Sequence, residues 1–91
     1  MEWRRSPDVV YEVVDGHAML VDPAGQEFLT LNEVGTLVWQ ALDGVRGPAE
    51  IAAAMMDRVD GVTLAEFERD IDTFIAETYA AGLVERSDGA N

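Results

Sequence analysis

The stretch from Leu29 to Gly44, LTLNEVGTLVWQALDG, constrains the fold more than any other part of the chain. Its first residues alternate as in a β-strand, and from Val34 onward apolar residues recur with the spacing of a helix. Asn32 stands where the pattern changes, and asparagine is a preferred N-cap residue. The stretch therefore predicts a strand that is joined directly to a helix, which ends at Asp43-Gly44.

Three segments rich in β-branched and aromatic residues predict strands, and two tight turns connect them: the strands are Val9–Val14, His17–Val21 and Gln26–Leu31. The first turn is Asp15-Gly16, a pair that tolerates the positive φ angles of a type I′ hairpin. The second turn, Asp22–Gly25, carries proline and glycine. Two short connections in succession predict an antiparallel meander with spatial order 1-2-3.

The remaining sequence predicts two further helices. Gly47-Pro48 places proline at the first helical position of one of them, and Gly61 ends it. Thr63 and Glu66 form a capping box that opens the other, which runs to about Ala81. The expected fold class is α+β: a winged helix-turn-helix-like single domain over residues 8–84, with a three-stranded antiparallel meander followed by three helices. Residues 1–7 are expected to be a flexible N-terminal arm and residues 85–91 a flexible tail.

Apolar residues at helical spacing predict which side of each helix faces the core. Gly35 interrupts the first helix, and we interpret it as a site of close packing against another backbone. The expected core stripes are Val34, Leu37, Val38, Ala41 and Leu42 in the first helix, Ile51, Met55 and Val59 in the second, and Leu64, Phe67, Ile71, Phe74, Ile75 and Thr78 in the third.

The net charge of −12 disfavours nucleic acids and anionic membrane surfaces as partners. The third helix alone carries five acidic residues and one arginine between Thr63 and Ala81, so it cannot lie in a DNA groove at reasonable cost. The absence of cysteine excludes disulfides and thiolate chemistry. No apolar run is long enough to span a membrane and the N-terminus lacks a secretory pattern, so cytoplasmic residence is the default expectation.

The sequence offers no combination of residues that indicates catalysis. His17 is the one histidine, and no serine–histidine–acid arrangement is apparent. The segment from Asp57 to Glu68 loosely resembles a calcium loop, but Val59 and Gly61 occupy positions where acids or amides are expected. We therefore expect no enzymatic activity, no metal and no cofactor.

The third strand of the meander has an unprotected outer edge, because it carries few of the residues that block strand pairing. Such an edge can accept an extended peptide as an additional strand, pair with a second copy of the chain, or be too short for either. Alternation places Phe28 and Thr30 on one face and Glu27, Leu29 and Leu31 on the other. The sequence leaves open which set faces the helices.

The pattern LN-x-x-G-x-x-V-W-x-x-L-D-G, following three strands, resembles the PqqD-like family of recognition elements for ribosomally synthesised and modified peptides. The residues that carry it are Leu31, Asn32, Gly35, Val38, Trp39, Leu42, Asp43 and Gly44, and the resemblance extends from about Val9 to Val84. Members are winged-helix modules that bind leader segments of precursor peptides. A stand-alone chain of this size looks like the leader-binding protein of lasso-peptide biosynthesis. The related chaperone of pyrroloquinoline quinone biosynthesis is the alternative.

The resemblance implies that a leader pairs antiparallel with the third strand and lies in a groove between it and the third helix. The implied peptide-binding residues are Glu27, Phe28, Leu29, Thr30 and Leu31 for main-chain hydrogen bonds, Ile71 and Phe74 as the floor, and Asp70 and Glu77 as an acidic flank. Glu68 and Asp72 are the alternative flank. Asn32 and Trp39 are interpreted structurally, as a cap and as core bulk.

Further implications of the resemblance concern the pathway. A small apolar pocket would take the rings of a Tyr-x-x-Pro element in the leader. The implied protein partners are a leader peptidase of the cysteine-protease type and, as a second candidate, an ATP-dependent macrolactam cyclase.

Overall fold

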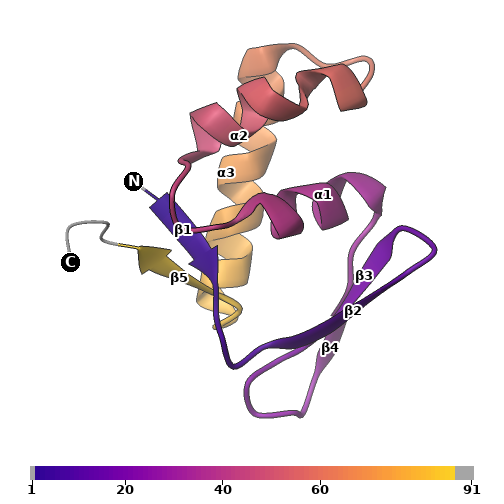
Figure 1. Ribbon diagram of the computed structural model, residues 1–91, viewed down its shortest axis with the longest axis vertical. Coiled ribbons are helices and arrows are strands. Elements are labelled where there is room, and N and C mark those ends of the chain that lie inside the picture. Colours follow the sequence, from indigo (N-terminus) through magenta and orange to yellow (C-terminus); the bar gives the residue numbers. More distant parts are fainter. Residues whose placement is uncertain (1, 88–91) are drawn as a thin grey trace.

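The computed structural model describes residues 2–87 and contains an α+β fold (Figure 1). In chain order the elements are β1 (Glu2–Arg5), β2 (Val10–Val14), β3 (His17–Val21), β4 (Phe28–Thr30), α1 (Glu33–Ala41), α2 (Pro48–Met55), the 3-10 helix η1 (Met56–Arg58), α3 (Leu64–Ala80) and β5 (Val84–Ser87). A three-stranded antiparallel sheet followed by three α-helices confirms the predicted fold class. In Figure 1, α1 lies along this sheet, and α2 crosses α3 farther from it.

The three-stranded sheet has the order β2-β3-β4, which confirms the predicted meander. Asp15 and Gly16 have φ angles of 53° and 82°, as a type I′ turn requires. The second turn is closed by Asp22, whose Oδ1 accepts hydrogen bonds from the backbone N–H groups of Gln26 at 2.8 Å and Glu27 at 3.4 Å. Both connections are therefore fixed by local chemistry, and the second one defines where β4 begins.

Side-chain caps begin α1 and α3 as the sequence predicts. Asn32 Oδ1 accepts a hydrogen bond from the backbone N–H of Gly35 at 2.7 Å, and Thr63 and Glu66 form the expected capping box. The interpretation of Gly35 needs correction. A Cβ atom at Gly35 would lie 3.2 Å from Asn32 Oδ1 and 3.5 Å from Leu31 Cβ, so the glycine leaves room for its own N-cap residue and not for another helix.

The core lies between the three-stranded sheet and the helices, and its largest fully buried side chains are Trp39, Leu20, Leu42, Ile51 and Ile71. The prediction of the core stripes is wrong at Val34 and Leu64. These residues lie in the first turns of their helices and are 39% and 47% exposed. Thr36 is buried instead. Its hydroxyl oxygen accepts a hydrogen bond from the backbone N–H of Ala18 at 2.8 Å, which attaches α1 to β3.

The two ends of the chain, which were expected to be flexible, form a second sheet of β1 and β5. Glu2–Arg5 pairs antiparallel with Val84–Ser87, and the N–H of Gly44 donates to the carbonyl of Trp3 at 2.8 Å. The Trp3 ring packs edge-on against Tyr79 with 5.2 Å between ring centroids. The arm is therefore ordered over residues 2–5 and the tail over residues 85–87. Residue 1 and residues 88–91 of the predicted ends lie outside the described residues.

Within residues 2–87, no helix has the length and apolar character needed to cross a membrane.

Candidate functional site

The outer edge of β4 carries backbone groups that the sheet does not use. Leu31 donates its N–H to the carbonyl of Ala18 at 2.8 Å, and the carbonyl of Glu27 accepts from the N–H of Asp22 at 3.1 Å. Backbone groups of successive residues point to opposite sides of a strand, so residues 27, 29 and 31 face β3. The N–H and C=O groups of Phe28 and Thr30 consequently point away from the sheet.

This geometry refines the expectation that all five residues from Glu27 to Leu31 supply main-chain hydrogen bonds. At the outer edge only Phe28 and Thr30 are oriented to do so. Leu31 is also only 7% exposed, so neither its backbone nor its side chain is available at this edge.

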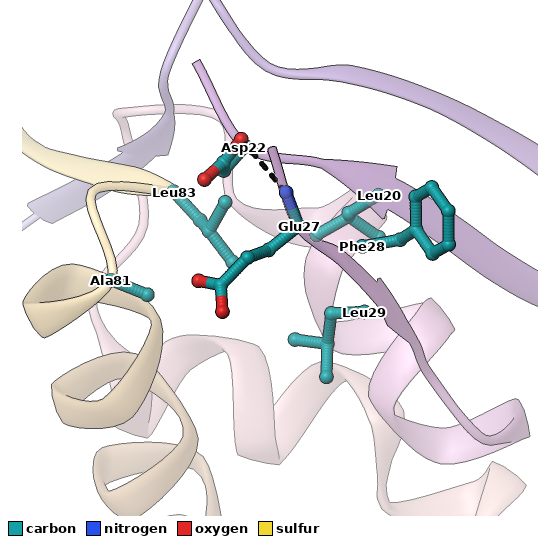
Figure 2. A pocket seen from close by; sticks show the side chains of 7 residues that line it. All are labelled: Leu20, Asp22, Glu27, Phe28, Leu29, Ala81 and Leu83. Atoms are coloured by element: carbon teal, nitrogen blue, oxygen red, sulfur yellow. Dashed lines mark hydrogen bonds between the residues drawn. The ribbon is translucent and has the colours of Figure 1, made fainter. Parts of the chain in front are cut away.

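The two faces of β4 have different surroundings. Leu29 pairs with Leu20, whose side chain is fully buried, so Glu27, Leu29 and Leu31 lie on the face toward the helices. Phe28 lies on the opposite face and is 80% exposed. Figure 2 shows the Phe28 ring directed away from Glu27 and Leu29. An extended chain added to this edge would have side chains on both faces.

A hollow of about 300 Å³ lies between the start of β4 and the end of α3. Leucine side chains supply its apolar surface, and carboxylates from the turn and the strand stand beside it (Figure 2); its lining residues are Leu20, Asp22, Glu27, Phe28, Leu29, Ala81 and Leu83. The Asp22 carboxylate is occupied by the turn, whereas the Glu27 carboxylate is directed toward Ala81. The hollow can take an apolar side chain that has a cationic or hydrogen-bond-donating neighbour.

The helical spacing of α3 indicates which of its flanks lies toward β4. Ala81, which lines the hollow, follows Asp70, Phe74 and Glu77 at intervals of 11, 7 and 4 residues, so all four share one side of the helix. Asp70 and Glu77 are exposed, and Phe74 is partly buried against the core. Carboxylates from α3 and from Glu27 therefore stand on the β4 side.

The alternative acidic flank faces a different part of the molecule. Glu68 and Asp72 line a separate hollow together with Trp3 and the start of α2. Ile71 was expected to form the floor of the groove, but it is 1% exposed and belongs to the core. Of the two floor residues, Phe74 alone reaches the surface.

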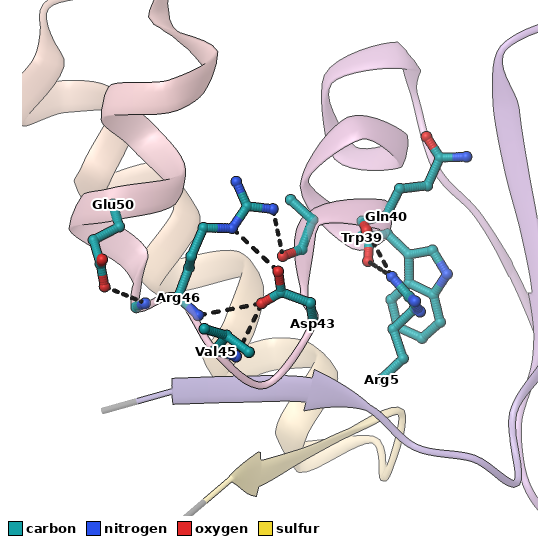
Figure 3. A network of polar contacts seen from close by, with 9 residues as sticks. Arg5, Trp39, Gln40, Asp43, Val45, Arg46 and Glu50 are labelled. Carbon is teal, nitrogen blue, oxygen red and sulfur yellow. Dashed lines mark hydrogen bonds and ion pairs between the residues drawn. The ribbon is translucent and has the colours of Figure 1, made fainter. Parts of the chain in front are cut away.

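The L-D-G part of the sequence pattern forms a polar network between α1 and α2 (Figure 3). Asp43 Oδ1 accepts hydrogen bonds from the N–H groups of Val45 at 2.9 Å and Arg46 at 3.2 Å, and Arg46 Nε donates to Oδ2 at 3.2 Å. The hydrogen bond from Val45 is the main reason that the pKa of Asp43 lies below its usual value, and Arg46 lowers it further.

Two arginines bind the carbonyl groups at the C-terminal end of α1. Arg5 Nη1 donates to the carbonyls of Trp39 at 3.0 Å and Gln40 at 2.7 Å, and Arg46 donates to Ala41 at 3.4 Å. Positive charge at a helix C-terminus is stabilising, because it meets the negative end of the helix dipole. The network thus holds the end of α1 against Arg5 of β1 and the loop that leads to α2.

His17 has a structural partner: its Nδ1–H donates to the carbonyl of Leu31 at 3.1 Å, at the junction of β4 and α1. In the part of the chain that the structure describes, no three carboxylates or histidines are grouped as a metal site would require.

The model of the family described as coenzyme PQQ synthesis protein D (PqqD) matches residues 17–84. Two solved structures are similar over most of the chain. TbiB1 in complex with the TbiA(beta) leader peptide is 26% identical, with a TM-score of 0.79 over 90% of this chain and 94% of that one. Lasso peptide synthetase B1 complexed with the leader peptide is 25% identical, with a TM-score of 0.80 over 93% and 99%. No curated protein matches the chain.

Proposed function

We propose a function from one premise: this chain belongs to the PqqD family, whose model matches residues 17–84. The proposed function is to bind the leader segment of a ribosomally synthesised precursor peptide as an additional strand on β4. The observation that carries the proposal is the pair of outward-facing residues, Phe28 and Thr30, beside an apolar hollow. Both similar solved structures are complexes with leader peptides, which supports the same ligand class here.

The backbone of β4 would hold the leader, and the hollow would select its side chains. In an antiparallel pairing, Phe28 and Thr30 would together exchange up to about four hydrogen bonds with the peptide. Peptide residues between those positions would point toward the helices, into the hollow lined by Leu20, Leu29 and Leu83. That hollow is the proposed site for one ring of a Tyr-x-x-Pro element, because residues three apart on an extended strand point to opposite faces.

The charge of the site favours a leader with basic residues. Glu27, Asp70 and Glu77 would stand along the bound peptide, in a protein whose net charge is −12. Opposite charge raises association rates and helps to fix register more than it raises affinity. We therefore assign orientation and specificity to the carboxylates, and affinity to the backbone and the apolar hollow.

We further propose that the protein is a non-catalytic adaptor of lasso-peptide biosynthesis in the cytoplasm. It would present the bound leader to a leader peptidase of the cysteine-protease type, and to an ATP-dependent macrolactam cyclase as a second partner. The description of the matching family raises the alternative of a PqqD-type chaperone in pyrroloquinoline quinone biosynthesis. The two alternatives differ in the precursor that binds.

Calorimetric titration tests this proposal with synthetic leader peptides of lasso-peptide precursors. We expect a dissociation constant of about 1 μM or tighter, equivalent to roughly −8 kcal/mol, and no binding of a scrambled peptide. Light scattering without peptide tests homodimerisation through β4. A stable dimer that does not dissociate when the leader is added contradicts the proposal.

A further inference from the structure

The outer face of the three-stranded sheet carries an apolar row that ends at the free edge. Val10 pairs with Val21, and Val21 pairs with Phe28, so these three residues lie side by side across the sheet. Val10 and Phe28 are 70% and 80% exposed. The row continues through all three strands on the side opposite the helices, and Phe28 is its last member.

The same face is hollowed beside this row. A depression of about 250 Å³ is lined by Val10, Tyr11, Glu12, Met19, Val21 and Phe28. Glu12 is the one charged residue among them, although the chain has a large excess of acidic residues. Single exposed apolar residues are ordinary on protein surfaces, whereas a contiguous apolar group of this kind marks a contact surface.

The geometry of strand addition identifies what would lie against Phe28. A peptide residue that exchanges hydrogen bonds with the outward N–H and C=O groups of Phe28 lies directly opposite it. Residues directly opposite each other have their side chains on the same face of a sheet, with Cβ atoms about 5 Å apart. The side chain of that peptide residue would therefore extend the row Val10–Val21–Phe28 by one member.

We propose that Phe28 and Val21 form a second recognition subsite, which selects a large aliphatic or aromatic residue in the bound peptide at the position opposite Phe28. This inference rests on the proposed function. The peptide residues immediately before and after this position would point into the hollow on the inner face, so the peptide is read on both faces of the sheet. The peptide residue two positions toward the peptide N-terminus would oppose Thr30. Thr30 lies beside Met19 and Glu12 across the sheet, so this peptide residue needs no large apolar side chain.

A selection experiment tests the subsite with a library of random dodecapeptides displayed on phage. The wild type, Phe28→Ala and the control Val45→Ala are immobilised separately. Val45 is 72% exposed, lies between α1 and α2, and does not line the depression on the outer face of the three-stranded sheet. The expected result is a large apolar residue at one fixed position in peptides selected by the wild type and the control. Phe28→Ala should lose that preference and keep the preferences at the two adjacent positions.

A double-mutant cycle in calorimetry measures the contact with the best selected peptide. Phe28→Ala and alanine at the selected peptide position should each weaken binding by about five- to tenfold, and the two changes together should weaken it little further. Because Phe28 is largely exposed, the thermal midpoint of Phe28→Ala should stay within a few degrees of the wild type.

Each remaining outcome contradicts a different part of the account. If the wild type enriches no peptide, the proposed function itself fails. If it enriches peptides whose preferences are the same with Phe28→Ala, or if the two alanine effects multiply independently, the outer subsite is wrong and strand addition stands. Self-association that is lost in Phe28→Ala would assign the face to a second copy of the chain, and overturns the subsite.

Discussion

The alternation of backbone groups along β4 makes a sharp prediction for proline substitutions. Thr30→Pro removes an N–H that faces away from the sheet, and Leu29→Pro removes one that faces β3. Thr30→Pro should therefore weaken leader binding with little loss of stability. Leu29→Pro should destabilise the fold, because it also leaves the paired carbonyl on β3 without its donor.

The magnitudes follow from the number of hydrogen bonds involved. Thr30→Pro removes one of about four peptide hydrogen bonds and leaves a peptide carbonyl unpaired at the interface. The cost is roughly 1–3 kcal/mol, or about fivefold to 150-fold in dissociation constant. Its unfolding free energy should fall by less than about 1 kcal/mol, since water already solvates that N–H. Leu29→Pro should lose about 2–4 kcal/mol of stability, which lowers the melting midpoint by roughly 10–25 °C.

Calorimetry with the leader and thermal unfolding by circular dichroism measure both quantities on the same samples. Thr30→Val is the matched control, because it keeps the backbone N–H and the β-branched shape and removes only the hydroxyl; it should bind within about threefold of the wild type. If Thr30→Pro binds as tightly as Thr30→Val, or if Leu29→Pro is as stable as Thr30→Pro, the assignment of outward and inward groups is refuted.

Three further predictions concern the fold that holds β4 in place. Thr36→Val should lose about 1–3 kcal/mol in denaturant unfolding, because the buried N–H of Ala18 loses its acceptor; Thr73→Val, at an exposed position of α3, should change stability by less than about 0.5 kcal/mol, and equal effects would contradict the role of Thr36. The lowered pKa of Asp43 means that its carboxylate stabilises the folded state above the ordinary pKa of 3.8 and loses this contribution as pH falls through the lower folded-state value. The difference in unfolding free energy between the wild type and Asp43→Asn should therefore shrink in that acidic range. A difference that grows there would contradict the network. Trp3→Ala should cost about 1 kcal/mol or more through loss of the Tyr79 contact, while the leader affinity, measured at β4, should stay unchanged; a matching loss of affinity would mean that the β1–β5 sheet takes part in binding.

Local sequence chemistry was sufficient to predict the elements around β4. The turn at Asp15-Gly16, the cap at Asn32 and the capping box at Thr63 act within a few residues, and each is present as expected. The same alternation that predicted the strand also separated Phe28 and Thr30 from Leu29. It could not identify the buried face, because both sets contain a large apolar residue and the choice depends on how α1 packs.

The features that the sequence did not predict depend on residues far apart in the chain. The pairing of Glu2–Arg5 with Val84–Ser87 joins the two ends of the described chain. Neither segment has the alternating apolar pattern that predicts a strand. Thr36 is buried because its hydroxyl oxygen accepts a hydrogen bond from the N–H of Ala18, which has no backbone acceptor at that point of the sheet. The sequence also left open which flank of α3 faces β4. Ala81 lines the hollow beside β4, whereas Glu68 and Asp72 line a separate hollow with Trp3 on the other side of α3.

Hydrogen exchange of individual backbone amides, followed by NMR with and without the leader, tests the central claim most directly. In the free protein the N–H groups of Phe28 and Thr30 should exchange rapidly, and that of Leu29 should be protected by its partner on β3. Saturating leader should slow exchange at Phe28 and Thr30 by about a hundredfold or more and leave Leu29 protected. Protection of Phe28 and Thr30 before any peptide is added, or rapid exchange that persists in the complex, would contradict strand addition at this edge.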